Sequence, residues 1–229
     1  LHLMLVSFYR PKGKRYKILC EAKAFPSDQY MMETHVKHHG FDPADAIIEI
    51  KPRAGEHIIR NEDLLQIIVQ HREELALVLF GGINYYSGQV VDMQTITQLA
   101  QQAGAKVGFD LAHAAGNIEM HLHKWHVDFA CWCSYKYLNA GPGSVAGAFV
   151  HERHHKNTDM PLFAGWWGHD KETRFKMDKE FNITVYGDGI AGWLYNQHIQ
   201  QKTWVNEFNA QIAERKKNGR NLNEWLSGL

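Results

Sequence analysis

Six short apolar segments recur along the first two thirds of the chain, and stretches with helical periodicity separate several of them. Residues 75–80, Leu-Ala-Leu-Val-Leu-Phe, are apolar at every position, which is typical of a strand that is covered on both faces. Strands that alternate with helices predict βαβ units, and hence an α/β fold with a mostly parallel sheet and helices on both faces. The expected strands are residues 16–20, 46–50, 75–80, 106–109, 129–133 and 147–151.

Two of the intervening segments have clear helical patterns. Residues 61–71 carry apolar side chains at helical spacing. Residues 92–103 begin at Asp92, a favoured N-cap residue type, and stop before Gly104, the residue type that most often ends a helix. Both segments are therefore expected to be helices that pack on the sheet.

The character of the sequence changes after about residue 181. Glycines interrupt the pattern there, and a polar segment with helical spacing follows. We expect residues 1–181 to form one large domain and residues 182–229 to form a separate, divergent and helical C-terminal segment. Because the chain begins with Leu1 rather than methionine, we also expect it to be a piece of a longer polypeptide.

The composition argues against several classes of partner. The 229 residues include 25 Lys and Arg and 25 Asp and Glu, a formal net charge of zero, so neither nucleic acid nor an anionic membrane is expected as the main partner. No apolar run approaches the roughly 20 residues of a membrane helix. The three cysteines, Cys20, Cys131 and Cys133, are expected to be free thiols in a reducing compartment.

One lysine is expected at the edge of the sheet where the ligand-binding residues of α/β folds lie. Lys136 lies just beyond the expected strand 129–133 and before a glycine-rich stretch. A desolvated lysine there can capture an aldehyde such as pyridoxal 5'-phosphate. Asp110 ends another strand and should project into the crevice at the carboxyl edge of the sheet, where a carboxylate would keep the cofactor's pyridine nitrogen protonated. His113 follows three residues later and is expected near the same ring.

Other residues near these segments have two interpretations. Phe25 offers a flat face for a cofactor ring, while Ser27 and Asp28 in the same segment are residue types that cap the helix that follows. The glycine-rich residues 141–147 either cradle a phosphate or form a tight turn that presents Lys136. We favour the turn, because Pro142 has no N–H to donate.

Two further groups of residues were weighed for binding. The histidines of residues 35–39 and 121–126 lack cysteine or carboxylate partners at ligand spacing, so no metal site is expected. Trp166 and Trp167 lie between glycines and expose two large rings, which indicates a binding wall or a subunit interface.

Four segments carry a family resemblance that is ordered along about residues 1–180. They are EAKAFPSD at 21–28, GFDLAHA at 108–114, DFACWCSYKYLNAG at 128–141, and GWWGH at 165–169 followed by TRFKM at 173–177. Together they resemble kynureninases. The resemblance implies the large domain of a fold type I enzyme that uses pyridoxal 5'-phosphate, is a cytoplasmic homodimer, and hydrolyses the amino acid L-kynurenine or 3-hydroxykynurenine. The products would be L-alanine and an anthranilate, in tryptophan catabolism.

By position, the resemblance also implies roles for single residues. Lys136 would hold the cofactor, Asp110 would pair with its ring nitrogen, and His113 would lie beside it. Tyr135 would contact the phosphate and relay a proton, and Trp166 would reach the phosphate from a neighbouring loop. The wall that stacks on the ring would consist of Phe25, Pro26, Ser27 and Asp28.

The chain departs from the kynureninase pattern at both ends. The family's phosphate-binding threonine would precede Leu1, and residues 182–229 lack the Ser-Asn-Pro-Pro motif and do not resemble the family's small domain. Two alternatives therefore stay open. One is a related fold type I enzyme, an aminotransferase or a cysteine desulfurase; the other is a truncated domain without catalytic activity.

Overall fold

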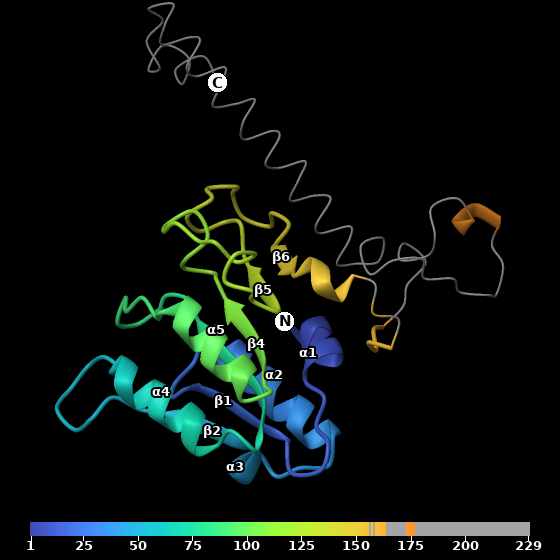
Figure 1. Cartoon of the computed structure of the whole chain (residues 1–229). Helices are drawn as coiled ribbons and strands as arrows, with labels where there is room; N and C mark the ends of the chain where they lie inside the picture. The colour runs from blue at the N-terminus through green and yellow to red at the C-terminus, as the bar shows by residue number, and fades with distance from the viewer. Residues whose placement is uncertain (156, 158, 164–172, 177–229) are drawn as a thin grey trace, which may run out of the picture.

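A six-stranded β-sheet forms the centre of the computed structural model, which describes residues 1–155, 157, 159–163 and 173–176 (Figure 1). The strand order is β2-β1-β3-β4-β5-β6, and every pair is parallel except the last, β5 with β6. The prediction of a mostly parallel α/β sheet is therefore confirmed. The strands are β1 (Lys17–Glu21), β2 (Ile47–Ile50), β3 (Leu75–Gly81), β4 (Lys106–Asp110), β5 (Phe129–Trp132) and β6 (Gly147–Val150).

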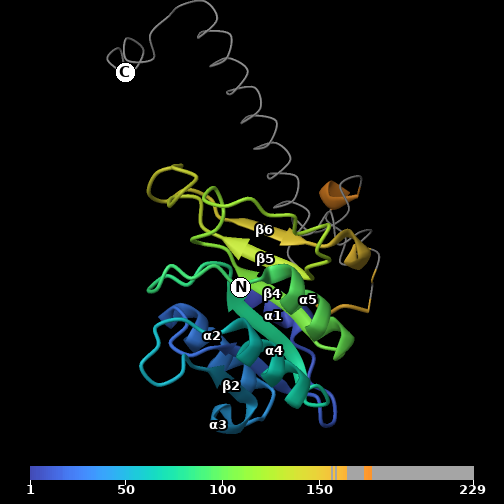
Figure 2. The same cartoon turned by 60° about the vertical axis from the view of Figure 1, so that its left-hand side comes forward.

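Helices cover both faces of this sheet (Figures 1 and 2). The buried residues of α1 (His2–Phe8) and α2 (Pro26–His38) pack with one face of the strands, and those of α4 (Asn61–Gln70) and α5 (Met93–Gln102) pack with the other. The remaining helical elements are short: α3 (Pro43–Ala46) and the 3₁₀ turns η1 (Glu152–His154) and η3 (Arg174–Lys176).

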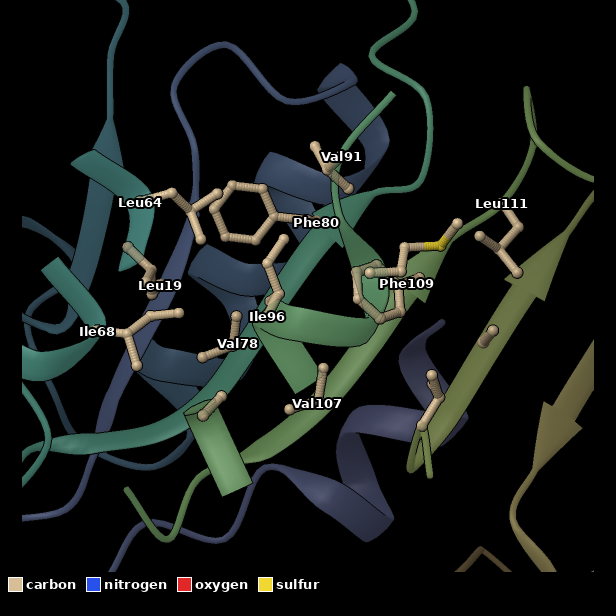
Figure 3. Packing of buried hydrophobic residues seen from close by; sticks show 14 of the residues in the cluster. Leu19, Leu64, Ile68, Val78, Phe80, Val91, Ile96, Val107, Phe109 and Leu111 are labelled. Atoms are coloured by element: carbon tan, nitrogen blue, oxygen red, sulfur yellow. The ribbon is translucent and has the colours of Figure 1, made fainter. Parts of the chain in front are cut away.

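The central strand β3 supplies the core of both layers. Its side chains alternate between the two faces, and Val78 and Phe80 point toward α4 and α5. Figure 3 shows these two side chains beside Leu64 and Ile68 of α4 and Ile96 of α5. All five side chains are at most 2% exposed. The prediction that the apolar run is a strand covered on both faces is therefore confirmed.

Close packing across the sheet depends on a glycine in β4. A Cβ atom at Gly108 would lie 2.1 Å from Cζ of Phe129 in the adjacent β5, well inside van der Waals contact. The Phe129 ring itself is fully buried and stacks on Phe8 of α1, with a ring-centroid distance of 4.8 Å. The missing side chain at Gly108 therefore leaves the space that lets β5 lie close to β4 and lets α1 pack on the sheet.

The helical predictions are also confirmed within a residue or two. Asp92 caps α5, since its side chain accepts a hydrogen bond from the Thr95 N–H at 3.0 Å. Gly104 follows the helix with φ of +84°, the left-handed conformation that favours glycine. None of the helices in the described part of the chain combines the length and apolar character needed to cross a bilayer. Trp166, Trp167 and the segment 182–229 lie outside the described residues.

Candidate active site

A pocket opens at the carboxyl edge of the sheet, where β1, β3, β4 and β5 end. It encloses about 220 Å³, more than the ~150 Å³ of a cavity that accommodates benzene, so a single substituted aromatic ring fits. Pro26 begins α2 outside the pocket lining, and Trp166 lies outside the described residues. The other expected site residues all line the pocket: Phe25, Ser27, Asp28, Asp110, His113, Tyr135 and Lys136.

Lys136 and His113 are in direct contact inside this pocket. The Lys136 Nζ atom lies 2.9 Å from His113 Nε2. Because an ammonium group only donates, the imidazole accepts through Nε2 and carries its proton on Nδ1. Burial and the charge of Lys136 lower the pKa of His113, while Asp110 acts in the opposite direction. The neutral imidazole thus orients the lysine amine toward the pocket.

Two carboxyl groups line the same pocket as the lysine. Asp110 is the last residue of β4, and its Oδ1 accepts the Ala112 N–H at 2.8 Å. Asp28, in the first turn of α2, is 8% exposed and hydrogen-bonds to Asp110. Burial, followed by the charge of Asp110, raises the pKa of Asp28 to about 8. The two carboxyl groups can therefore share a proton at neutral pH, and such a pair can hold a basic ring nitrogen in its protonated form.

The alternative role for Ser27 and Asp28 as helix caps is wrong. The N-cap of α2 is Phe25, which makes no side-chain cap hydrogen bond, and Pro26 occupies the first helical position. The Ser27 hydroxyl donates instead to Asp28 Oδ1 at 3.3 Å. The proline starts the helix without a polar cap, which leaves both polar side chains directed into the pocket.

An aromatic wall faces the amine. The Lys136 Nζ atom lies 5.7 Å from the centre of the Phe25 ring, and Phe25 meets the edge of Tyr85 at 5.4 Å and 89°. Phe25 remains 46% exposed. An aromatic face this open beside a charged pocket is suited to stacking on a flat ligand.

The loop that carries Lys136 is fastened at its base by Ser134, which is 3% exposed. The Ser134 hydroxyl donates to the Val145 carbonyl at 2.8 Å, and its own carbonyl accepts the Ala140 N–H at 3.1 Å. Gly141 and Gly143 have φ values of +85° and +77°, which supports the interpretation of this stretch as a tight turn.

Tyr135 stands beside the lysine at the mouth of the pocket and is 55% exposed. Its hydrogen bond with Cys133 raises the pKa of the phenol. A largely exposed hydroxyl that keeps its proton at neutral pH can donate a hydrogen bond to an anionic group of a bound ligand.

Glu21 lines the pocket as well, although it was not among the site residues expected from the sequence. Glu21, the last residue of β1, is 6% exposed and accepts the Gly81 N–H through both carboxylate oxygens, at 3.0 and 3.3 Å. Burial raises its pKa to about 7. Tyr85, in the loop after β3, reaches the same wall. Glu21 lies in the segment that resembles kynureninases, but only the pairing of β1 with β3 brings it to Gly81.

Cys20 is part of the scaffold, whereas Cys131 and Cys133 also line the pocket. Cys20 lies in β1 and Cys131 in β5, and burial raises the pKa of both thiols. Cys133 follows β5 directly, and all three thiols are free. Among the described residues, no group of three or more His, Cys, Asp or Glu side chains is arranged to hold a metal ion.

Several known proteins have similar sequences. The sequence model of the family described as Aminotransferase class-V matches residues 46–170. The kynureninase of Flavobacterium johnsoniae is 65% identical over 193 residues, which are 84% of this chain and 45% of that protein. The kynureninase of Homo sapiens is 52% identical over 193 residues, 84% of this chain and 41% of that protein. The resemblance to kynureninases is thus confirmed, and the chain spans about half the length of the relatives that it matches.

A solved structure confirms the fold class. The complex of the cystine C-S lyase C-DES with cysteine persulfide superposes with a TM-score of 0.62, covering 82% of this chain and 47% of that chain at 16% identity. At this identity the likeness concerns the fold alone, which is that of the fold type I enzymes.

Proposed function

Since the chain belongs to the aminotransferase class-V family, we propose that it is the cofactor-binding part of a kynureninase. This enzyme would use pyridoxal 5'-phosphate to hydrolyse L-kynurenine or 3-hydroxykynurenine to an anthranilate and L-alanine, in the cytoplasm. The observation that carries the proposal is the shared pocket of Lys136 and Asp110, one from the loop after β5 and one from the end of β4, in a chain 65% identical to a kynureninase.

The described residues fit this cofactor by their chemistry. The amine of Lys136 would take its aldehyde, and the proton shared by Asp110 and Asp28 would lie at its ring nitrogen. Phe25 would cover the ring face, and Tyr135 would donate to the phosphate. When bound, the cofactor supplies an electron sink for the negative charge that is left when the α-proton is removed and when the bond beyond the β-carbon breaks.

The chain's own groups would then move the protons. Lys136 would be the base that takes the α-proton, and His113 accepts a hydrogen bond from its amine. Tyr135 or Lys136 would return a proton to the carbon freed by cleavage. Each acid or base step of this kind accounts for about 10²- to 10⁴-fold in rate.

The placement of the thiols disfavours a cysteine desulfurase. That chemistry needs a nucleophilic cysteine that moves to the substrate, whereas Cys20 and Cys131 lie within strands and burial raises the pKa of both. Cys131 and Cys133 line the pocket, but Cys131 is held within β5 and Cys133 lies immediately after it on a fastened loop. An aminotransferase would share the Lys and Asp groups. Analysis of the reaction products would distinguish it from a kynureninase.

A homodimer is the proposed assembly. Loops at the carboxyl edge of the sheet expose large apolar side chains around the pocket, and exposed apolar surface of this kind marks contact sites. We define the rim as Tyr86, Tyr137, Leu138 and Val145, which are 89%, 45%, 42% and 53% exposed. A second copy that covers the rim would also close the pocket.

The proposal is tested by adding the cofactor to purified protein. The wild-type chain should develop the visible absorption band of a lysine-bound cofactor, and Lys136→Ala should not. Release of anthranilate from kynurenine, followed by its fluorescence, reports turnover. Binding without turnover would instead support the non-catalytic alternative, and an unchanged band in Lys136→Ala would refute the assignment of the lysine.

A further inference from the structure

One wall of the pocket is built from two segments that follow neighbouring strands. The segment after β1 carries Phe25, and the segment after β3 carries Tyr85. Both side chains line the pocket, and their rings meet edge to face at 5.4 Å. Because the two rings are in contact, the way in which the loop after β3 is held affects the surface against which Phe25 packs.

The base of the same two segments is joined by Glu21. Its carboxylate accepts the Gly81 N–H at 3.0 and 3.3 Å, and a Cβ atom at Gly81 would lie 2.9 Å from Glu21 Oε1. The next N–H, that of Gly82, donates to the Asp110 carbonyl at 2.8 Å. Two consecutive amides thus tie the start of this loop to the ends of β1 and β4.

Burying the Glu21 carboxyl group at the edge of the pocket costs free energy. A carboxyl group that is 6% exposed loses most of its hydration, and its raised pKa reflects that burial. An apolar side chain would avoid this cost but could not accept the Gly81 N–H. The buried carboxyl is therefore explained by the hydrogen bond that it makes at the edge of the pocket.

We infer that Glu21 is a positioning residue of the pocket: by holding Gly81 it sets the loop that presses Tyr85 against Phe25. The contact between the two rings then fixes the face that a flat ligand would meet. The identity of that ligand rests on the proposed function, whereas the fastening of the loop does not.

The first test needs no ligand. Glu21→Ala removes the acceptor, while Glu21→Gln keeps an amide oxygen that can accept the Gly81 N–H. Hydrogen exchange in residues 81–90 should become at least about tenfold faster in Glu21→Ala and stay within about threefold of wild type in Glu21→Gln. Glu49→Ala, at an exposed position on the neighbouring strand β2, is the matched control. Equal exchange in wild type and Glu21→Ala would overturn the inference.

The second test measures the cofactor affinity of the same variants. Glu21→Ala should weaken binding of pyridoxal 5'-phosphate about tenfold, with Glu21→Gln near wild type. Tyr85→Ala should weaken it by a similar factor, and the double variant should lose less than the product of the two, because both act through one wall. Additive losses, or a Glu21→Gln variant as weak as Glu21→Ala, would contradict this role.

Two outcomes separate this inference from the proposed function. Absence of cofactor binding by the wild-type chain would refute the proposed function and leave the exchange experiment to decide on Glu21. Should Glu21→Ala fail to fold, Tyr85→Ala decides, since Tyr85 is 40% exposed and its truncation leaves no buried cavity. An unchanged cofactor affinity in Tyr85→Ala would then overturn the inference.

Discussion

Asp28 makes the stability of the cofactor-free chain depend on pH. In the folded chain its pKa is raised to about 8 by burial and by Asp110, whereas an aspartic acid in an unfolded chain ionises near pH 4. Between these values the folded state binds more protons, so the free energy of unfolding falls as pH rises. The slope due to this one group is at most about 1.4 kcal/mol per pH unit.

The variant Asp28→Asn removes that titration. We expect its free energy of unfolding, measured in urea without cofactor, to fall less than that of wild type between pH 5 and pH 8. The control Glu33→Gln, at an exposed position on α2, should follow the wild-type slope. Parallel slopes for Asp28→Asn and wild type would show that Asp28 does not hold a proton in the folded chain.

Single residues of the site differ in how far the sequence could predict them. Asp110 and Lys136 each follow an apolar strand, so the rule that ligands bind at the carboxyl edge of parallel strands predicts their meeting. Glu21 also ends a strand, but its partner is a backbone amide of another strand. No pattern of side chains marks an amide, and the role of Glu21 therefore appears only in the folded chain.

At the scale of elements, the contact between β4 and β5 depends on the missing side chain of Gly108. The variant Gly108→Ala should destabilise the chain by about 1 to 3 kcal/mol or more, because its Cβ would overlap the Phe129 ring. Thermal unfolding measures the loss. Combining it with Phe129→Leu should cost less than the two single changes together, since the smaller side chain leaves room. Strict additivity would show that the overlap is not the cause.

A buried carboxylate links neighbouring elements at the other end of these strands, opposite the carboxyl edge of the sheet. Asp128 is fully buried and accepts hydrogen bonds from the Val107 N–H at 2.9 Å, from Arg153 at 2.6 Å and from His154 at 2.7 Å. Burial alone would raise its pKa, but the hydrogen bond from His154 and the charges of Lys106 and Arg153 hold that pKa well below its ordinary value. This group therefore joins β4 and η1 to the start of β5.

The variant Asp128→Ala should cost about 3 to 5 kcal/mol, because it leaves buried donors without an acceptor. In the wild type the stabilisation is present above about pH 4 and is lost as pH falls toward the lowered native pKa. Asp128→Ala should consequently lose less stability than wild type on acidification from pH 5 to pH 3. Urea titrations at both pH values measure this, with the exposed Glu73→Ala as control. Equal acid sensitivity would contradict the assignment.

The elements themselves were predictable where burial leaves a periodic pattern. All six expected strands are present. Each contains enough apolar residues to be recognised from the sequence alone. Helix α1 was not expected, since its seven residues are too few to show a period. The strand order and the reversed direction of β6 depend on contacts between distant segments, which local patterns do not encode.

At the scale of the whole molecule, the pocket is open to solvent because the rim residues around it are exposed. The acids, the lysine and the aromatic wall all lie at one edge of the sheet, in strand ends, the first turn of α2 and the adjoining loops. The rim residues are exposed. A site that must exclude bulk water during proton transfer needs a cover over these loops, and the proposed homodimer would provide it.

The homodimer predicts that charge placed on the rim weakens self-association. Tyr86→Asp and Leu138→Asp should each raise the dimer dissociation constant at least about tenfold, because a carboxylate in an apolar interface loses its hydration. Val69→Asp is the matched control: Val69 is 51% exposed near the end of α4, which leads to the start of β3 at the opposite edge of the sheet. Sedimentation velocity over a concentration series measures the constants. Equal weakening by all three changes would indicate a general effect of charge, and a monomeric wild type would refute the dimer.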